Sequence, residues 1–416
     1  MTTRTPLVPT STITALLLLS THAQNIPSIT RTTQNLTTKV VGRSTINPVD
    51  GSINFDNPGT WIDVVNLNLT TNNTMTLSKS SSTAASDYFV IDCDGVRQPD
   101  ESFNTTTWTP HEHVIVPFCS SLPKASTARV FKTTEAQWNS LVPANNYITF
   151  HGATGITVIN AANTTTDTTT DTTTDTTTTD TTTTDTTTLR PRRIEFLGDS
   201  ITAGFCNLCD STGTNTAATE SYADSWANLI CQSFDAECHT SAWSGYGVVE
   251  NCCGGKTLMS DVWRRTLASV PSSNASDPHG TNAGNVWNFS TWIPDVVVIN
   301  LGTNDELQSR PNNIEKYNAT YLSLLQQASA EYGSGTIFFL ACGPMSESYC
   351  DPVDWILDQA SVLGIRAMFL DQRGFLDGKH GKSCCGHPSA TVDRAMAEAG
   401  AAAIGNVTGW RGSYLP

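Results

Sequence analysis

From residue 190 onward, short apolar segments alternate with amphipathic ones, and this alternation limits the possible fold more than any other feature of the chain. Continuous apolar strands between amphipathic helices are typical of a parallel sheet covered on both faces. We therefore predict a three-layer α/β/α domain over residues 191–412. Its expected strands are 194–197, 296–300, 336–341 and 366–370, and its expected helices are 222–234, 314–332, 353–362 and 389–404.

The first part of the chain has a different pattern. Residues 40–162 contain short strand-prone segments separated by turn residues, with almost no helical periodicity. The clearest segments are 61–65, 88–92 and 113–118. This pattern predicts a small, jelly-roll-like β-sandwich domain in front of the α/β domain.

A tract of threonine and aspartate separates the two parts. Residues 164–188 contain no other residue type, so they have no apolar surface to bury against the entropy cost of ordering. We predict a disordered linker over 163–190, which threonine O-glycosylation would stiffen. Its regularly spaced carboxylates could suggest calcium, but the tract lacks the glycine turns and clustered ligands of calcium loops.

The amino terminus and the composition indicate an exported protein. Residues 1–23 combine Arg4, an apolar run and a small-residue exit, which is a signal-peptide pattern, although a weakly apolar arm is the alternative. No later segment has the ~20 apolar residues of a membrane span. The net charge of −15 argues against nucleic acid as a partner. Nine glycosylation sequons are permissive of export: Asn35, Asn68, Asn72, Asn104, Asn163, Asn274, Asn288, Asn318 and Asn406.

The chain has twelve cysteines, an even number that fits disulfide formation in an exported protein. Cys93 and Cys119 are the only two before the threonine–aspartate tract, so we expect them to pair. The adjacent cysteines at 252–253 and 384–385 are interpreted as disulfide joints in loops. The Cys206-x-x-Cys209 spacing could suggest zinc, but no second pair follows at finger spacing, so we expect no metal.

Three short motifs could bring catalytic groups together. Gly198-Asp199-Ser200 follows one predicted strand, Asn304 follows the next, and His387 lies in the loop before the last helix. Ligands of open parallel sheets sit outside the carboxyl ends of the strands, so one crevice could hold all three side chains. A serine, an imidazole and an amide are the groups that acyl transfer requires.

Each motif taken alone also fits a structural role. Gly198-Asp199-Ser200 could be only a tight turn, with Asp199 capping it. Asn304 could close an Asx turn, and His387 could simply precede a helix. His380 is interpreted as a solvent-facing loop residue. It is the ordered combination of motifs that favours catalysis.

The motifs resemble those of the SGNH (GDSL-type) hydrolases. The matching blocks are Gly198-Asp199-Ser200, Gly245, Gly302-Thr303-Asn304-Asp305 and His387-Pro388. Within that superfamily, the two-domain layout is similar to carbohydrate esterase family 2. The front domain shares the resemblance in segments 90–95, 113–116 and 132–136.

The resemblance implies a role for each matched residue. Ser200 would be the nucleophile and His387 the general base. The amides of Ser200 and Gly245, with the Asn304 side chain, would form the oxyanion hole. It also implies a serine esterase without a cofactor that deacetylates plant cell-wall polysaccharides such as xylan or glucomannan. We expect such a protein to be a monomer.

One position departs from the family pattern. The aspartate expected two or three residues before the histidine is replaced by Cys385 and Cys384. Some family members are thought to use a Ser–His dyad, in which a main-chain carbonyl holds the imidazole. Asp377 or Asp371 is the alternative orienter.

Two other function classes remain open. One is a lipase or thioesterase acting on longer acyl esters, and the other is a carbohydrate-binding glycoprotein whose catalytic site has decayed. We also predict that Trp243 and Tyr246 line a sugar-binding cleft, because aromatic faces stack on pyranose rings. The alternative for these two, as for Trp263, is a place in the core.

Overall fold

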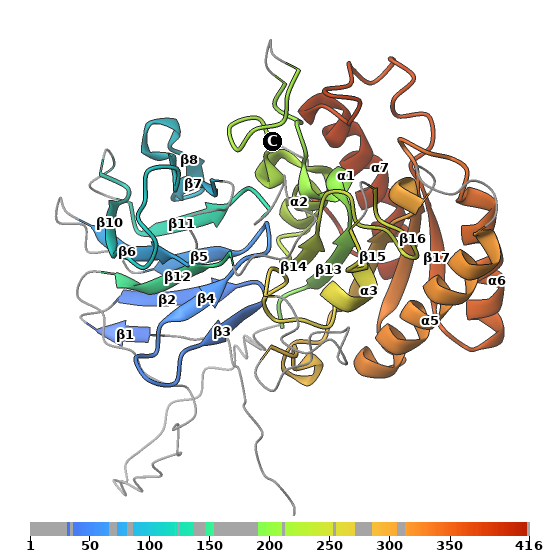
Figure 1. Ribbon diagram of the computed structural model, residues 1–416, viewed down its shortest axis with the longest axis horizontal. Coiled ribbons are helices and arrows are strands. Elements are labelled where there is room, and N and C mark those ends of the chain that lie inside the picture. The colour runs from blue at the N-terminus through green and yellow to red at the C-terminus, as the bar shows by residue number, and fades with distance from the viewer. Residues whose placement is uncertain are drawn as a thin grey trace, which may run out of the picture.

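The computed structural model consists of an antiparallel β region and an α/β region that lie side by side (Figure 1). It describes residues 31–33, 36–65, 73–80, 86–120, 122, 125–135, 146–153, 190–209, 213–252, 255–270, 285–305 and 313–413. The predicted signal peptide, nearly all of the predicted linker and Cys253 lie outside the described residues.

The first region contains two antiparallel sheets. The strands of one are, in spatial order, β1 (Arg31–Thr33), β2 (Leu36–Val41), β5 (Trp61–Val65), β11 (Thr127–Lys132), β7 (Tyr88–Cys93) and β8 (Val96–Arg97), with β9 (Phe103–Asn104) also paired to β7. Those of the other are β10 (Val114–Pro117), β6 (Thr74–Lys79), β12 (Ile148–Ala153), β4 (Ile53–Phe55) and β3 (Ser44–Ile46). The short helix η1 (Pro99–Glu101) follows β8.

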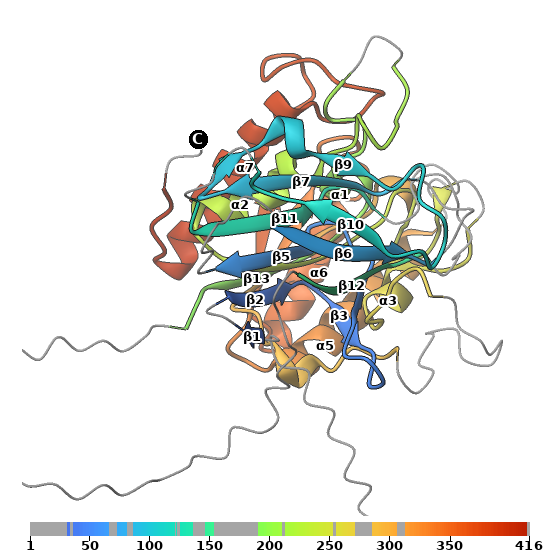
Figure 2. The same cartoon turned by 90° about the vertical axis from the view of Figure 1, so that its left-hand side faces the viewer.

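The two sheets pack face to face around one apolar core (Figure 2). Ile62 and Phe89 from the first sheet and Leu77 and Phe150 from the second are all buried in it. Alternate residues of such strands point inward, so a half-apolar sequence is enough to fill the core. The predicted disulfide between Cys93 and Cys119 is confirmed. Because the two sheets share this apolar core, the expected β-sandwich is also confirmed.

The second region is built on a five-stranded parallel sheet in the order β14 (Glu237–Ala242), β13 (Arg193–Gly198), β15 (Val296–Asn300), β16 (Ile337–Cys342) and β17 (Ala367–Asp371). Gly198 is in register with Ala242 on one side and with Asn300 on the other, so the strands end at a common edge. The four predicted strands are confirmed to within one residue, but β14 was not predicted.

Helices cover both faces of this sheet. On one face lie α2 (Trp226–Ser233) and α7 (Ala390–Thr408). On the other lie α3 (Met259–Val262), α5 (Ile314–Tyr332) and α6 (Cys350–Val362). The prediction of one continuous helix over 222–234 was wrong. Ser225 adopts an extended conformation and caps α2, so η3 (Tyr222–Asp224) is a separate short helix. Shorter elements are α1 (Ser200–Ala203) and η5 (Phe289–Thr291).

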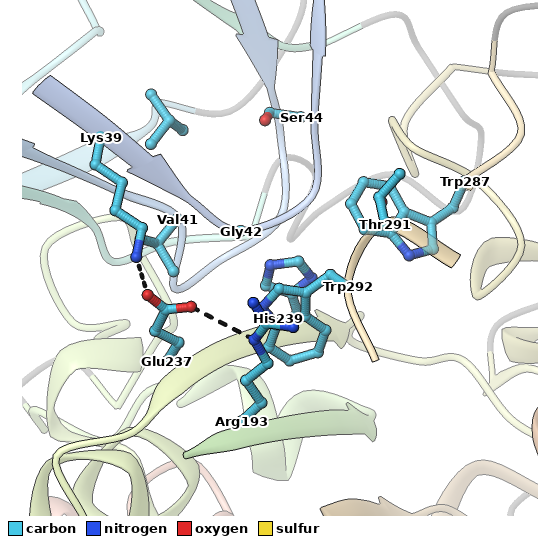
Figure 3. A pocket seen from close by; sticks show the side chains of 11 residues that line it. Lys39, Val41, Gly42, Ser44, Arg193, Glu237, His239, Trp287, Thr291 and Trp292 are labelled. Atoms are coloured by element: carbon cyan, nitrogen blue, oxygen red, sulfur yellow. Dashed lines mark hydrogen bonds and ion pairs between the residues drawn. The ribbon is translucent and has the colours of Figure 1, made fainter. Parts of the chain in front are cut away.

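The β-sandwich packs against β14, the edge strand of the parallel sheet (Figure 1). Arg43 of the sandwich forms a fully buried ion pair with Glu195 of β13, 2.6 Å apart. Nearby, Glu237 pairs with both Lys39 and Arg193 beside a small interdomain pocket (Figure 3). Breaking a buried pair leaves an uncompensated charge, so such contacts fix how the two domains meet.

Across the described residues, none of the helices combines the length and apolar character needed to cross a membrane.

Candidate active site

Ser200 lies where β13 ends and α1 begins. Gly198 permits this sharp turn, because a Cβ there would lie 2.1 Å from the Thr202 Oγ1. Asp199 caps α1 by accepting a hydrogen bond from the Ile201 amide at 3.0 Å, so its predicted capping role is confirmed. The turn presents Ser200 at the carboxyl edge of the sheet.

His387 lies beside Ser200. Its Nε2 is 2.9 Å from the Ser200 Oγ, and its Nδ1 is 3.2 Å from the Cys385 carbonyl oxygen. A carbonyl can only accept, so Nδ1 carries the proton in the neutral ring and Nε2 is left to accept from the serine hydroxyl. This is the tautomer that a general base requires. The ring also contacts Phe205, at a centroid distance of 4.6 Å.

The contact with the Cys385 carbonyl agrees with the dyad arrangement, and neither alternative orienter, Asp377 or Asp371, holds the imidazole. Asp377 accepts from the main chain and side chain of Lys379, and Asp371 pairs with Arg373. Both carboxylates are exposed, and each is held by a basic residue two positions further on. The main-chain carbonyl of Cys385 therefore occupies the place of the carboxylate.

The two cysteines in place of the family aspartate hold the histidine loop. Cys385 forms a disulfide with Cys206, and Cys384 forms one with Cys209. Cys206 and Cys209 follow α1, which begins at Ser200. Two covalent bonds thus connect the chain around the serine with the chain around the histidine.

Removing one of these bonds should affect activity as well as stability. We expect Cys206→Ala with Cys385→Ala to lower the free energy of unfolding by about 2–5 kcal/mol. We also expect kcat for an acetyl ester to fall by about tenfold, because the imidazole loses its positioning. Cys93→Ala with Cys119→Ala removes a disulfide of the β-sandwich and is the control, expected to change Tm and not kcat. Equal kcat values for the two double variants would contradict this role.

Asn304 and Gly245 face the same edge of the sheet. Asn304 Nδ2 donates to the Tyr246 carbonyl at 2.8 Å and, at the longer distance of 3.3 Å, to Asp199 Oδ2. Gly245 has φ +83°, a left-handed conformation that favours glycine. It belongs to the loop 243–247, called the Gly245 loop below, which follows β14.

Asp305 holds the chain directly after this loop. Its carboxylate accepts from the amides of Val248, Val249 and Glu250 at 2.9, 2.6 and 3.1 Å. Neighbouring residues Asn304 and Asp305 therefore hold two parts of the same segment. The sequence motif contained Asp305, but its role in fixing this segment was not predicted.

Burial shifts the pKa values of two site residues. Desolvation is the main factor that raises the pKa of Asp199 to about 7, and the nearby Asp305 also raises it. Desolvation lowers the pKa of His387, while its hydrogen bond with the Cys385 carbonyl acts in the opposite direction. The imidazole is therefore neutral, and able to accept a proton, at neutral pH.

The prediction that Trp243 and Tyr246 line a sugar-binding cleft was wrong. Trp243 and Tyr246 are 2% and 4% exposed and belong to the apolar core on one face of the sheet, as does Trp263. Their rings present no face on which a sugar could stack. His380 is exposed, as predicted.

A paired serine and histidine at the carboxyl edge of a parallel sheet, with an asparagine amide beside them, is the arrangement of an SGNH hydrolase site. Residues 196–363 match the GDSL-like Lipase/Acylhydrolase family. The match lies in the α/β region, contains Ser200 and Asn304, and agrees with the resemblance to the SGNH (GDSL-type) hydrolases that the motifs predicted.

Among proteins of known function, the chain is similar to two enzymes. It is 31% identical over 229 residues to the cellulase/esterase CelE of Acetivibrio thermocellus, matching 53% of this chain and 26% of that one. It is 26% identical over 224 residues to the acetylxylan esterase / glucomannan deacetylase of Cellvibrio japonicus, matching 50% of this chain and 57% of the relative. It thus spans about a quarter of the length of the first and little more than half of the second.

Solved structures of family 2 carbohydrate esterases share the fold. One from Clostridium thermocellum, in complex with cellohexaose, superposes with a TM-score of 0.68 at 23% identity, covering 90% of this chain and 99% of that one. One from Cellvibrio japonicus superposes with a TM-score of 0.66 at 17% identity, covering 92% and 98%. The similarity therefore includes both domains.

Proposed function

We propose that this protein is a secreted serine esterase that removes acetyl groups from plant cell-wall polysaccharides. The observation that carries the proposal is the 2.9 Å contact between Ser200 Oγ and His387 Nε2, in a tautomer suited to proton transfer. The carbohydrate esterases to which the chain is similar support the acetylated polysaccharide as substrate. Five disulfides among the described residues support an oxidising, extracellular location.

The chemistry begins at the serine. Ser200 Oγ attacks the acetyl carbonyl carbon while His387 Nε2 takes the hydroxyl proton. The resulting imidazolium is stabilised through its Nδ1 hydrogen bond to the Cys385 carbonyl. It then returns the proton to the departing sugar oxygen, which leaves an acetyl-Ser200 ester. Water then attacks the acetyl carbonyl carbon while the same imidazole takes its proton. The bond between this carbon and Ser200 Oγ breaks, Oγ takes the proton back from the imidazolium, and acetic acid is released.

Negative charge develops on the former carbonyl oxygen. The amides of Ser200 and Gly245 and the Asn304 side chain are the donors that would stabilise it. Asn304 has a long contact with Asp199 that can be exchanged for the oxyanion, while its 2.8 Å bond to the Tyr246 carbonyl stays in place. No step in this scheme needs a metal or a cofactor.

Activity should persist into mildly acidic conditions. Because burial lowers the pKa of His387 from its ordinary value of 6.5, the neutral base survives as the pH falls below that value. We expect kcat/KM for 4-nitrophenyl acetate to be constant near neutral pH and to reach half of its maximum below pH 6.5. A half-maximum above pH 7 would mean that His387 is not the base that limits the reaction.

Three assays separate the candidate functions. An acetyl esterase hydrolyses 4-nitrophenyl acetate faster than the octanoate and releases acetic acid from acetylated xylan or glucomannan. A preference for the octanoate would instead indicate a lipase or thioesterase. Binding to the polysaccharide without turnover of any ester would indicate a carbohydrate-binding glycoprotein.

A further inference from the structure

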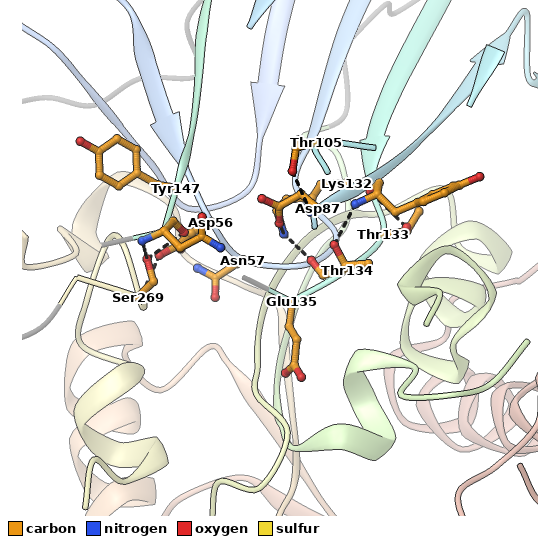
Figure 4. Close-up of polar contacts among 12 residues, drawn as sticks. Asp56, Asn57, Asp87, Thr105, Lys132, Thr133, Thr134, Glu135, Tyr147 and Ser269 are labelled. Atoms are coloured by element: carbon orange, nitrogen blue, oxygen red, sulfur yellow. Dashed lines mark hydrogen bonds and ion pairs between the residues drawn. The ribbon is translucent and has the colours of Figure 1, made fainter. Parts of the chain in front are cut away.

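A carboxylate of the β-sandwich reaches the Gly245 loop. Glu135 follows β11, and its Oε2 accepts a hydrogen bond from the Ser244 amide at 2.6 Å. Ser244 immediately precedes Gly245, and the two bonded residues are 109 positions apart in the sequence. Glu135 is 1% exposed and points from the sandwich toward the α/β domain (Figure 4).

Buried contacts hold Glu135 in place and continue toward the histidine. The Glu135 amide donates to Glu220 Oε1 at 2.7 Å, and Glu220 Oε2 accepts from Asn215 Nδ2 at 3.0 Å. Asn215 Oδ1 in turn accepts from the Cys206 amide at 2.7 Å. Cys206 forms the disulfide with Cys385, whose carbonyl oxygen contacts His387. The same network therefore touches both sides of the reaction site.

The sandwich segment that carries Glu135 is itself fixed. Lys132 forms an ion pair with Asp87 at 2.7 Å, and both side chains are buried. The Tyr222 amide, from the α/β domain, donates to the Thr133 carbonyl at 2.7 Å. Glu135 is thus held on an ordered element, which a residue that positions another group requires.

The geometry of the Gly245 loop explains what this contact can control. Gly245 lies between two anchored amides: Ser244 donates to Glu135, and Tyr246 donates to the Trp243 carbonyl at 3.2 Å. Gly245 has no side chain to restrict its peptide planes. Its N–H direction is therefore set by these two anchors and by the hydrogen bond that the Gly245 carbonyl accepts from the Cys252 amide at 2.9 Å. Of these three contacts, the one with Glu135 comes from the other domain.

We propose that Glu135 is a positioning residue of the oxyanion hole, and that through it the β-sandwich forms part of the active site. The inference rests on the proposed function, in which the Gly245 amide stabilises the oxyanion. It goes further by giving the first domain a role in catalysis.

A carboxylate at this position carries a stability cost. Burial is the main factor that raises the pKa of Glu135 to about 7, and burial together with Glu135 raises the pKa of Glu220 well above its ordinary value. A residue needed only for packing would be better served by an apolar side chain. What the site requires of Glu135 is an acceptor oxygen, which a neutral amide also provides.

Full-length variants assayed on 4-nitrophenyl acetate test this role. We expect Glu135→Ala to lower kcat by about 10- to 100-fold, the cost of a displaced catalytic group. KM should stay within about twofold, because the contact acts on the transition state. Glu135→Gln keeps an acceptor and should retain kcat within about threefold. Asp56→Ala is the matched control, since Asp56 Oδ2 accepts from the Ser269 amide across the same domain interface at 2.7 Å.

Asp56→Ala should lower Tm without changing kcat. The positioning role is overturned if Glu135→Ala behaves like Asp56→Ala, or if Glu135→Gln loses as much activity as Glu135→Ala. If Glu135→Ala fails to fold, Glu135→Asp replaces it, because the shortened side chain withdraws the carboxylate and should lower kcat by about tenfold.

Hydrogen exchange separates this inference from the proposed function. In Glu135→Ala, and not in Glu135→Gln or Asp56→Ala, amide exchange within residues 243–247 should become faster. A wild-type protein that hydrolyses no ester would refute the proposed function, while the exchange data would still show whether Glu135 holds the loop. Unchanged exchange in Glu135→Ala would refute the positioning role even in an active enzyme.

Discussion

Replacing Ser200 by alanine should lower kcat for acetyl ester hydrolysis by about 10⁴-fold or more, the loss typical of removing a catalytic nucleophile. The substitution removes the oxygen that forms the acyl-enzyme and leaves His387 without a proton to accept. Folding should be unaffected, because the hydroxyl bonds to the His387 imidazole and supports no other described contact. The measurement is steady-state hydrolysis of 4-nitrophenyl acetate together with thermal unfolding.

Ser323→Ala is a suitable control, since this hydroxyl lies exposed on α5. It should have wild-type kcat and Tm. Activity in Ser200→Ala above about 1% of wild type would be incompatible with an acyl-Ser200 intermediate. Ser200→Ala should still bind acetylated xylan, which would show that the variant has lost the chemical step and not substrate binding.

The elements that sequence predicted well are those whose burial demands apolar side chains. Strand β15 is buried along its whole length, and the run Val296–Asn300 was identified without error. Strand β14 was missed because three consecutive buried residues, His239, Thr240 and Ser241, are polar, so the strand has neither an apolar run nor an alternating pattern. His239 of this strand stacks on Trp292 at 3.7 Å, a contact that no local pattern indicates.

The site was predictable where local geometry determines function. Ser200, Asn304 and His387 each follow a strand or precede a helix of a parallel sheet, so topology brings them to one edge. The sequence offered a main-chain carbonyl or a carboxylate as the orienter of His387 and could not decide between them, because the disulfide partners of Cys384 and Cys385 cannot be deduced from spacing. The structure shows that these cysteines replace the carboxylate with covalent bonds and a main-chain carbonyl.

Contacts between domains were the least predictable part. Glu135 lies more than a hundred residues before Ser244, and no motif distinguishes it from an ordinary surface acid. A signal existed only indirectly, in the resemblance of segment 132–136 to the family. Trp243 was assigned to the substrate cleft because aromatic faces stack on sugars. In the structure its Nε1 instead donates to Asn57 of the sandwich at 3.2 Å, an interdomain contact that the sequence does not indicate.

Asn304→Ala should have the second-largest effect, a fall in kcat of about 10²- to 10³-fold, as expected for the loss of one oxyanion donor. KM should change little, because the ground-state carbonyl needs this donor less than the oxyanion does. Asn304→Asp should be at least as damaging, since it places a carboxylate beside Asp199 and Asp305 where negative charge develops. A parallel measurement of Tm identifies any loss through the Tyr246 contact.

The kcat values of these two variants and of the double variant test whether Ser200 and Asn304 act on the same transition state. If Ser200→Ala and Asn304→Ala act on one transition state, the double variant should be no slower than Ser200→Ala alone, because a missing nucleophile leaves no oxyanion to stabilise. Additive losses would mean that Asn304 acts elsewhere, for example by holding the Tyr246 carbonyl and thereby the Gly245 loop. A rise in KM with unchanged kcat would instead place Asn304 in ground-state binding.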